Sequence, residues 1–166
     1  MRTRISIQVC FLMLVIGFLG CGERNIERAI ENFDVPDKLT LYSIDDRDPE
    51  PVKEPKSDEK FHGYSVLGKI EVTDPNKRKE IISALKEGMA KSDGSMAKCF
   101  WPRPAIRVVE KGQTIDYVVC FECLQLHVHE GKESKTKPIT HDPQRVFNRH
   151  LKQAGVPLAP GMTNDE

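Results

Sequence analysis

The strongest constraint on the fold is an Asp-Pro pair that occurs twice, each time before an apolar repeat of helical spacing. Asp74-Pro75 precedes apolar residues that recur every three or four positions from Ile81 to Met89, and Asp142-Pro143 precedes a similar stripe from Val146 to Ala154. An Asp side chain caps a helix N-terminus, and proline fits the first turn. We therefore expect two amphipathic helices, each closed by a glycine.

Apolar and polar residues alternate elsewhere, as they do in half-buried strands. One such run covers 39–44, and a second predicts a common face for alternate residues from Tyr64 to Val72. A hairpin is expected from Ile106 to Val119, and its strand pattern continues through 120–128. Hairpins with two helices predict an α+β domain, in which both main helices pack on one face of a mainly antiparallel sheet.

The length of 166 residues suits one such domain. We expect it to span 39–158, after an anchor and short helix at 21–38 and before a tail at 159–166. Residues 45–60 are mostly charged or proline, so they predict a solvent-exposed loop.

The first twenty residues have the features of an export signal. Arg2 and Arg4 precede an apolar run that ends in small residues, and the run is shorter than the roughly 20 residues that span a bilayer. Phe18-Leu19-Gly20-Cys21 resembles a lipobox, which implies cleavage of residues 1–20 and attachment of lipid to Cys21. Several acyl chains form a stable membrane anchor. We therefore expect a lipoprotein of the bacterial cell envelope, and Gly22 favours the outer membrane.

The charge is balanced, with 25 Lys+Arg and 25 Asp+Glu. Loss of Arg2 and Arg4 with the signal leaves 25 − 2 = 23 basic residues against 25 acidic ones. This balance argues against nucleic-acid binding, so the expected partners are the membrane, through Cys21, and an envelope protein.

Three cysteines remain once Cys10 leaves with the signal and Cys21 is lipidated, namely Cys99, Cys120 and Cys123. They could form one disulfide and a free thiol, three thiols or a metal site. The CxxC at 120–123 resembles a redox dithiol, but no helix follows it to activate a thiol. A structural disulfide, for example from Cys99 to a neighbouring strand, is the simplest alternative.

Zinc could be held by the three thiolates with His127 or His129 as the fourth ligand. Positions 120 and 123 of a regular strand point to opposite faces, so a bulge would be needed. There is no second CxxC. We therefore expect no cofactor, with zinc as the alternative.

No catalytic triad, phosphate-binding glycine loop or carboxylate pair stands out, which predicts that the protein is not an enzyme. The rigid segment 101–104 either packs as a corner or offers Trp101 and Arg103 to a partner. A binding domain is the leading hypothesis, and metal binding or thiol redox chemistry is the alternative.

Several motifs recur together: Leu41-Tyr42-Ser43-Ile44-Asp45, Phe61-His62-Gly63-Tyr64, Val66-Leu67-Gly68, Cys99-Phe100-Trp101-Pro102-Arg103, Cys120-Phe121-Glu122-Cys123 and Ala154-Gly155-Val156-Pro157-Leu158. The set resembles a family of small uncharacterised lipoproteins and secreted proteins of planctomycete-type bacteria, with CFxPR and CFEC motifs. The resemblance covers roughly Leu39 to Leu158 and implies no activity. Pro104 stands where members often have histidine.

Overall fold

The computed structural model describes residues 35–45 and 58–160. Residues 1–34 lie outside these ranges. They include the expected signal, the lipid attachment site at Cys21 and most of the predicted anchor and short helix at 21–38. Most of the predicted charged loop also lies outside the described residues.

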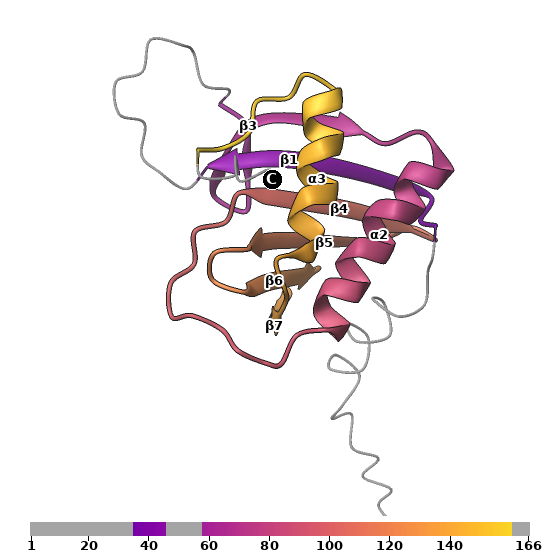
Figure 1. Ribbon diagram of the computed structural model, residues 1–166. Coiled ribbons are helices and arrows are strands. Elements are labelled where there is room, and N and C mark those ends of the chain that lie inside the picture. The colour runs from indigo at the N-terminus through magenta and orange to yellow at the C-terminus, as the bar shows by residue number, and fades with distance from the viewer. Residues whose placement is uncertain (1–34, 46–57, 161–166) are drawn as a thin grey trace, which may run out of the picture.

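A seven-stranded antiparallel sheet forms the centre of the domain (Figure 1). Its spatial order is β2-β3-β1-β4-β5-β6-β7. The strands are β1 Lys38–Asp45, β2 Lys60–Phe61, β3 Tyr64–Glu71, β4 Pro104–Glu110, β5 Gln113–Cys120, β6 Gln125–Glu130 and β7 Glu133–Pro138. Together with two helices, this sheet confirms the α+β class.

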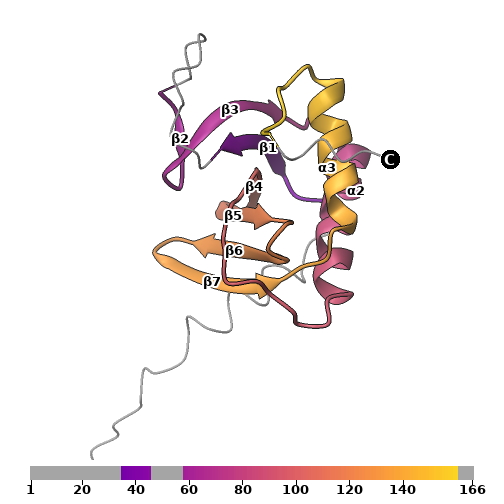
Figure 2. The ribbon, with the colours of Figure 1, turned by 60° about the vertical axis from the view of Figure 1, so that its left-hand side comes forward.

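Two helices, α2 Pro75–Ala90 and α3 Asp142–Gln153, lie on the same side of the sheet in Figure 2. Their apolar residues join strand residues in the larger core, which includes Leu85 of α2, Phe147 of α3 and Ile106 of β4. Asp74 caps α2 as predicted, because its Oδ1 accepts the N–H of Asn76 at 2.8 Å.

The predicted cap of the second helix is wrong by one residue. Asp142 is the first helical residue of α3, and His141 takes the cap position without a side-chain hydrogen bond. The Asp142 carboxylate in the first turn still stabilises α3, because its negative charge lies near the positive end of the helix dipole.

A smaller core lies on the other face of the sheet and contains Tyr42, Phe61 and Val118. The sheet curls so that the turn between β2 and β3 reaches across this face to β5 and β6. The His62 ring stacks on the His129 ring with centroids 4.0 Å apart. Each face of the curled sheet therefore has its own core.

The predicted common face of alternate residues from Tyr64 to Val72 is wrong. The register of β3 against β1 shifts because Ser43 pairs with Gly68 whereas Ile44 pairs with Val66. The extra residue is a bulge, which reverses the faces on its two sides. Val66 therefore lies in the smaller core and Val72 in the larger one.

The strand predicted to continue through 120–128 is interrupted by a turn at 121–124, and the strand at 133–138 was not predicted.

The limits of the charged loop also change, because Asp45 ends β1 and Lys60 begins β2. Ala159, the first residue of the predicted tail, is fully buried. Within the described residues, no helix is long and apolar enough to cross a membrane.

Candidate functional site

The turn between β5 and β6 brings the two cysteines of the CxxC together. Cys120 ends β5, and the chain reverses through Leu124, whose φ of 54° is in the left-handed region. The Leu124 N–H donates to the Phe121 carbonyl at 3.1 Å. Cys120 and Cys123 form a disulfide with Cα atoms 5.3 Å apart. A tight turn thus brings the Cys120 and Cys123 side chains together, whereas the sequence pattern predicted that a bulge would be needed.

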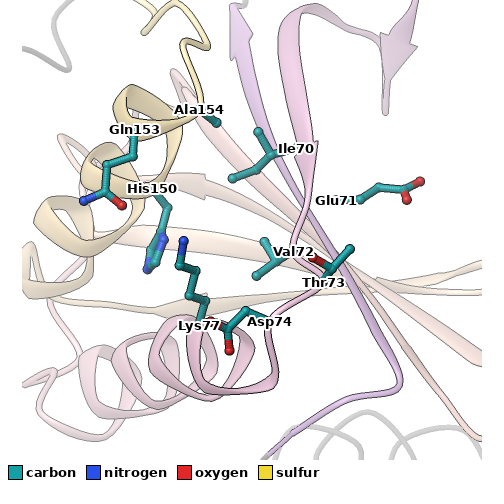
Figure 3. A pocket seen from close by; sticks show the side chains of 9 residues that line it. All are labelled: Ile70, Glu71, Val72, Thr73, Asp74, Lys77, His150, Gln153 and Ala154. Carbon is teal, nitrogen blue, oxygen red and sulfur yellow. The ribbon is translucent and has the colours of Figure 1, made fainter.

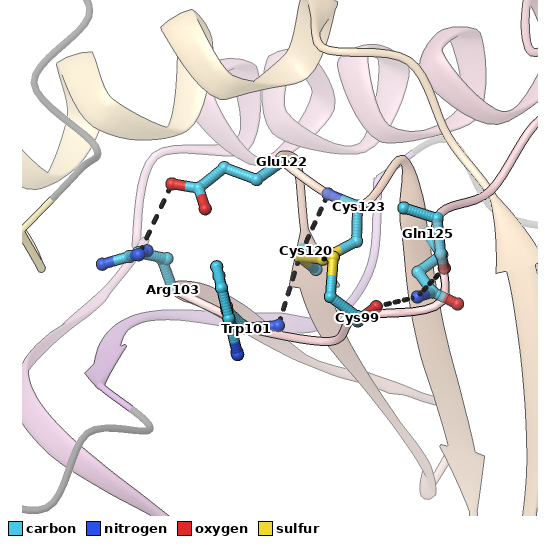
Figure 4. Close-up of a disulfide and its surroundings, with 8 residues drawn as sticks. Cys99, Trp101, Arg103, Cys120, Glu122, Cys123 and Gln125 are labelled. Carbon is cyan, nitrogen blue, oxygen red and sulfur yellow. Dashed lines mark hydrogen bonds and ion pairs between the residues drawn. A yellow bond between two sulfur atoms is a disulfide. The ribbon is translucent and has the colours of Figure 1, made fainter.

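Cys99 joins this pair from the segment between α2 and β4. Its Sγ lies 2.8 Å from the Sγ of Cys123, and it is the free cysteine of the described residues (Figure 4). The expected disulfide from Cys99 to a neighbouring strand is therefore not the one formed. We call Cys99, Cys120 and Cys123 the three-cysteine centre.

Hydrogen bonds that are only partly buried hold the Cys99 segment against the turn. The Ala97 N–H donates to the Cys123 carbonyl at 2.9 Å. The amide of Gln125, which is buried at the start of β6, donates to the carbonyls of Ala97 and Cys99. The position of Cys99 is therefore fixed by the β5–β6 hairpin.

Two N–H groups point at the sulfur of Cys120. The backbone N–H of Trp101 lies 3.4 Å from it, and that of Cys123 lies 3.2 Å from it. Such donors stabilise negative charge on sulfur, as a helix N-terminus does for the reactive thiolate of known redox proteins.

Trp101 and Arg103, the two residues predicted to offer a recognition surface, lie beside this centre (Figure 4). Trp101 is 54% exposed. Arg103 is largely buried, and its Nη2 lies 3.4 Å from Glu122 Oε1. Its Nε and Nη1 atoms are buried and find no hydrogen-bond partner among the described residues. The Trp101 side chain is thus exposed to solvent, whereas Arg103 contacts Glu122 of the turn.

The two candidate histidine ligands stack on other rings. His127 stacks on Phe100 with centroids 3.8 Å apart, and His129 stacks on His62. Burial lowers the pKa of both His127 and His129. Among the described residues, no group of three or more His, Cys, Asp or Glu side chains has an arrangement suited to a metal ion.

A polar cluster that the sequence did not predict lies on the same face as these histidines. Asp116 is buried and accepts two hydrogen bonds from Arg107, at 2.8 and 2.7 Å, while His62 Nε2 lies 2.8 Å from Asp116 Oδ2. The register of the predicted hairpin pairs Arg107 with Asp116 and could have revealed the ion pair. Nothing in the sequence pattern brings His62 to it.

A pocket of about 360 Å³ lies away from the cysteines, where β3 ends between the start of α2 and the end of α3 (Figure 3). His150 lines it together with Lys77. The Nε2 atom of His150 is 2.8 Å from Glu80 Oε2, so this imidazole links the two helices. We assign no ligand to this pocket.

Comparison with known proteins finds no match for the chain among protein families, curated proteins or solved structures.

Proposed function

We propose that the protein is an exported, lipid-tethered domain of the bacterial cell envelope whose three-cysteine centre exchanges disulfides with a partner. The proposal depends on one observation: the free Sγ of Cys99 lies 2.8 Å from the Sγ of Cys123, which is bonded to Cys120. Disulfides exchange when a thiolate attacks a disulfide sulfur, and these atoms are already in contact.

In the first step, Cys99 loses its proton to water and attacks Cys123. The Cys99–Cys123 bond forms, the Cys120–Cys123 bond breaks, and Cys120 leaves as a thiolate that takes up a proton. The step changes no oxidation state. The N–H groups of Trp101 and Cys123 support it, because they stabilise charge on the departing sulfur.

In the second step, a thiolate of a partner dithiol attacks Cys99 and releases Cys123. The second thiol of the partner then displaces Cys99, so that the partner gains a disulfide and the centre ends as three thiols. Two electrons pass from the partner to the protein. Cys99 is the point of attack because it is partly exposed, whereas Cys120 and Cys123 are fully buried.

Disulfide mapping tests the first step on protein purified from membranes in detergent. After rapid acid quenching and alkylation, we expect both the Cys120–Cys123 and the Cys99–Cys123 bonds. Cys120→Ser should contain only the Cys99–Cys123 bond, and Cys99→Ser only the Cys120–Cys123 bond. The Cys99→Ser protein should react with dithiothreitol at least tenfold more slowly. Equal rates for this variant and the wild type would refute the proposal.

Native mass spectrometry separates this chemistry from the metal-binding alternative. The purified protein should be two hydrogens lighter than its reduced form and carry no metal. Zinc retained by three reduced cysteines would overturn the redox proposal and establish a metal-binding protein.

The tether has its own test, because it depends on residues outside those described. We expect Cys21→Ala to move the protein from the membrane fraction to the soluble fraction, since several buried acyl chains hold the wild type. Retention of this variant on the membrane would contradict lipid attachment at Cys21.

Binding of an envelope protein without chemistry is the second candidate, and the exposure of Trp101 favours it. Crosslinking in intact cells should then give a product that persists when all three cysteines are changed to serine and disappears in Trp101→Ala. Loss of the product in the serine variant would favour disulfide exchange instead.

A further inference from the structure

The exposed apolar side chains near the three-cysteine centre indicate what kind of partner it meets. The large hydrophobic side chains exposed in the described residues are Val35, Met96 and Trp101, and two of them lie within three residues of Cys99. Single exposed hydrophobic residues are common on protein surfaces, so the informative feature is their position on both sides of the reactive thiol.

Both flanks of Cys99 are fixed to the centre rather than free to move with the surface. On one side, the Trp101 N–H lies 3.4 Å from Cys120 Sγ. On the other, Ala97, the neighbour of Met96, is bonded through its N–H to Cys123 and through its carbonyl to Gln125. A partner that contacts the exposed side chains is therefore held within a few residues of the thiol.

We propose that the partner is a polypeptide whose cysteine is flanked by apolar side chains, which pack on Trp101 and Met96 while its thiolate attacks Cys99. This inference rests on the proposed disulfide exchange. Tryptophan supplies a large contact area with little loss of side-chain freedom, and aromatic anchors of this kind dominate binding energy. A small hydrophilic thiol such as glutathione has no apolar group to place on the indole.

The test compares three probes on the purified protein. One is a synthetic nine-residue peptide with a single cysteine between leucine and phenylalanine, the second has serine in place of both apolar residues, and the third is glutathione. The rate constant for mixed-disulfide formation is measured by acid quenching and intact mass. We expect the apolar peptide to react about tenfold faster than the serine peptide, which corresponds to about 1.4 kcal/mol.

Trp101→Ala should remove this advantage and leave the rates of the serine peptide and glutathione within about twofold of the wild type. Trp101→Phe should retain part of it. Val35→Ala, which removes an exposed apolar side chain distant in sequence, should change none of the rates.

Equal rates of the two peptides with the wild type would overturn the inference and leave disulfide exchange intact. An equal loss for all three probes in Trp101→Ala would also overturn it, since the indole would then affect the reactivity of the cysteines rather than bind the apolar residues of the peptide. If glutathione and both peptides fail to react with the wild type, it is the proposed function that fails.

Discussion

The contact between α2 and α3 leaves no room for a side chain at Gly88. A Cβ atom added there would lie 2.9 Å from Cδ of Pro143 and 3.1 Å from Cγ1 of Ile139. The Gly88 carbonyl also accepts the Thr140 N–H at 3.0 Å. Neither neighbour can yield easily, because Pro143 has a rigid ring and Ile139 is fully buried.

We expect Gly88→Ala to destabilise the protein by about 2 kcal/mol. Overpacking a close contact of this kind costs about 3 kcal/mol, and the better helix propensity of alanine returns about 1 kcal/mol. The midpoint of thermal unfolding, followed by circular dichroism, should fall by about 6 °C.

A double-mutant cycle checks that the clash is the cause. Pro143→Ala removes the ring but leaves the contact with Ile139, whose cost we expect to cancel the propensity gain of alanine. In that background Gly88→Ala should therefore be close to neutral, with a coupling energy of about 2 kcal/mol. Stabilisation of the wild type by Gly88→Ala, or an absence of coupling to Pro143, would refute the reasoning.

Two further predictions concern the face of the sheet that carries the histidines. Asp116→Asn should lower the free energy of unfolding, measured in urea, by about 2 kcal/mol, because its carboxylate is only 7% exposed and accepts both hydrogen bonds from Arg107. As a control, Glu59→Gln, which removes an exposed ion pair with Lys69, should cost less than about 1 kcal/mol. Burial lowers the pKa of His127 and His129, so the unfolded chain binds more protons than the folded one. The free energy of unfolding should therefore fall as the pH drops below about 6.5, the ordinary histidine pKa. A urea midpoint that stays constant from pH 7 to 5 would contradict this.

The sequence predicted the fold where its signals are local. Asp74-Pro75 fixes the start of α2 through a cap, and the turn at Lys111-Gly112, where both residues have positive φ, joins β4 to β5. The faces of β3 could not be predicted in the same way. Its bulge has no marker except Gly68, whose Cβ would lie 2.9 Å from Val156, a residue far along the chain.

The sequence singled out the three cysteines as candidates but did not predict how they come together. Cys120 and Cys123 lie in an apolar alternating run, so the pattern suggested a continuous strand with the two side chains on opposite faces. The turn depends on Leu124 in the left-handed region, a conformation that leucine rarely adopts and that composition cannot reveal. Gln125 gave no signal, because its role depends on carbonyls that are more than twenty residues away.

The two possible disulfides of the centre differ in the length of chain that they close. Cys120–Cys123 joins residues three positions apart, whereas Cys99–Cys123 would join residues 24 apart. A longer closed loop restricts the unfolded chain more, by about 1.6 kcal/mol for these two lengths in the chain-entropy account. The three sulfurs are already together in the folded state, so folding adds little difference between the bonds.

Under oxidising conditions, Cys120→Ser, which leaves only the Cys99–Cys123 bond, should therefore be about 1.5 kcal/mol more stable than Cys99→Ser. Each variant is compared with its own reduced form, which cancels the effect of the serine. A smaller or reversed difference would mean that forming the Cys99–Cys123 bond distorts the folded segment. The contact between Cys99 and Cys123 would then not represent a geometry ready for exchange.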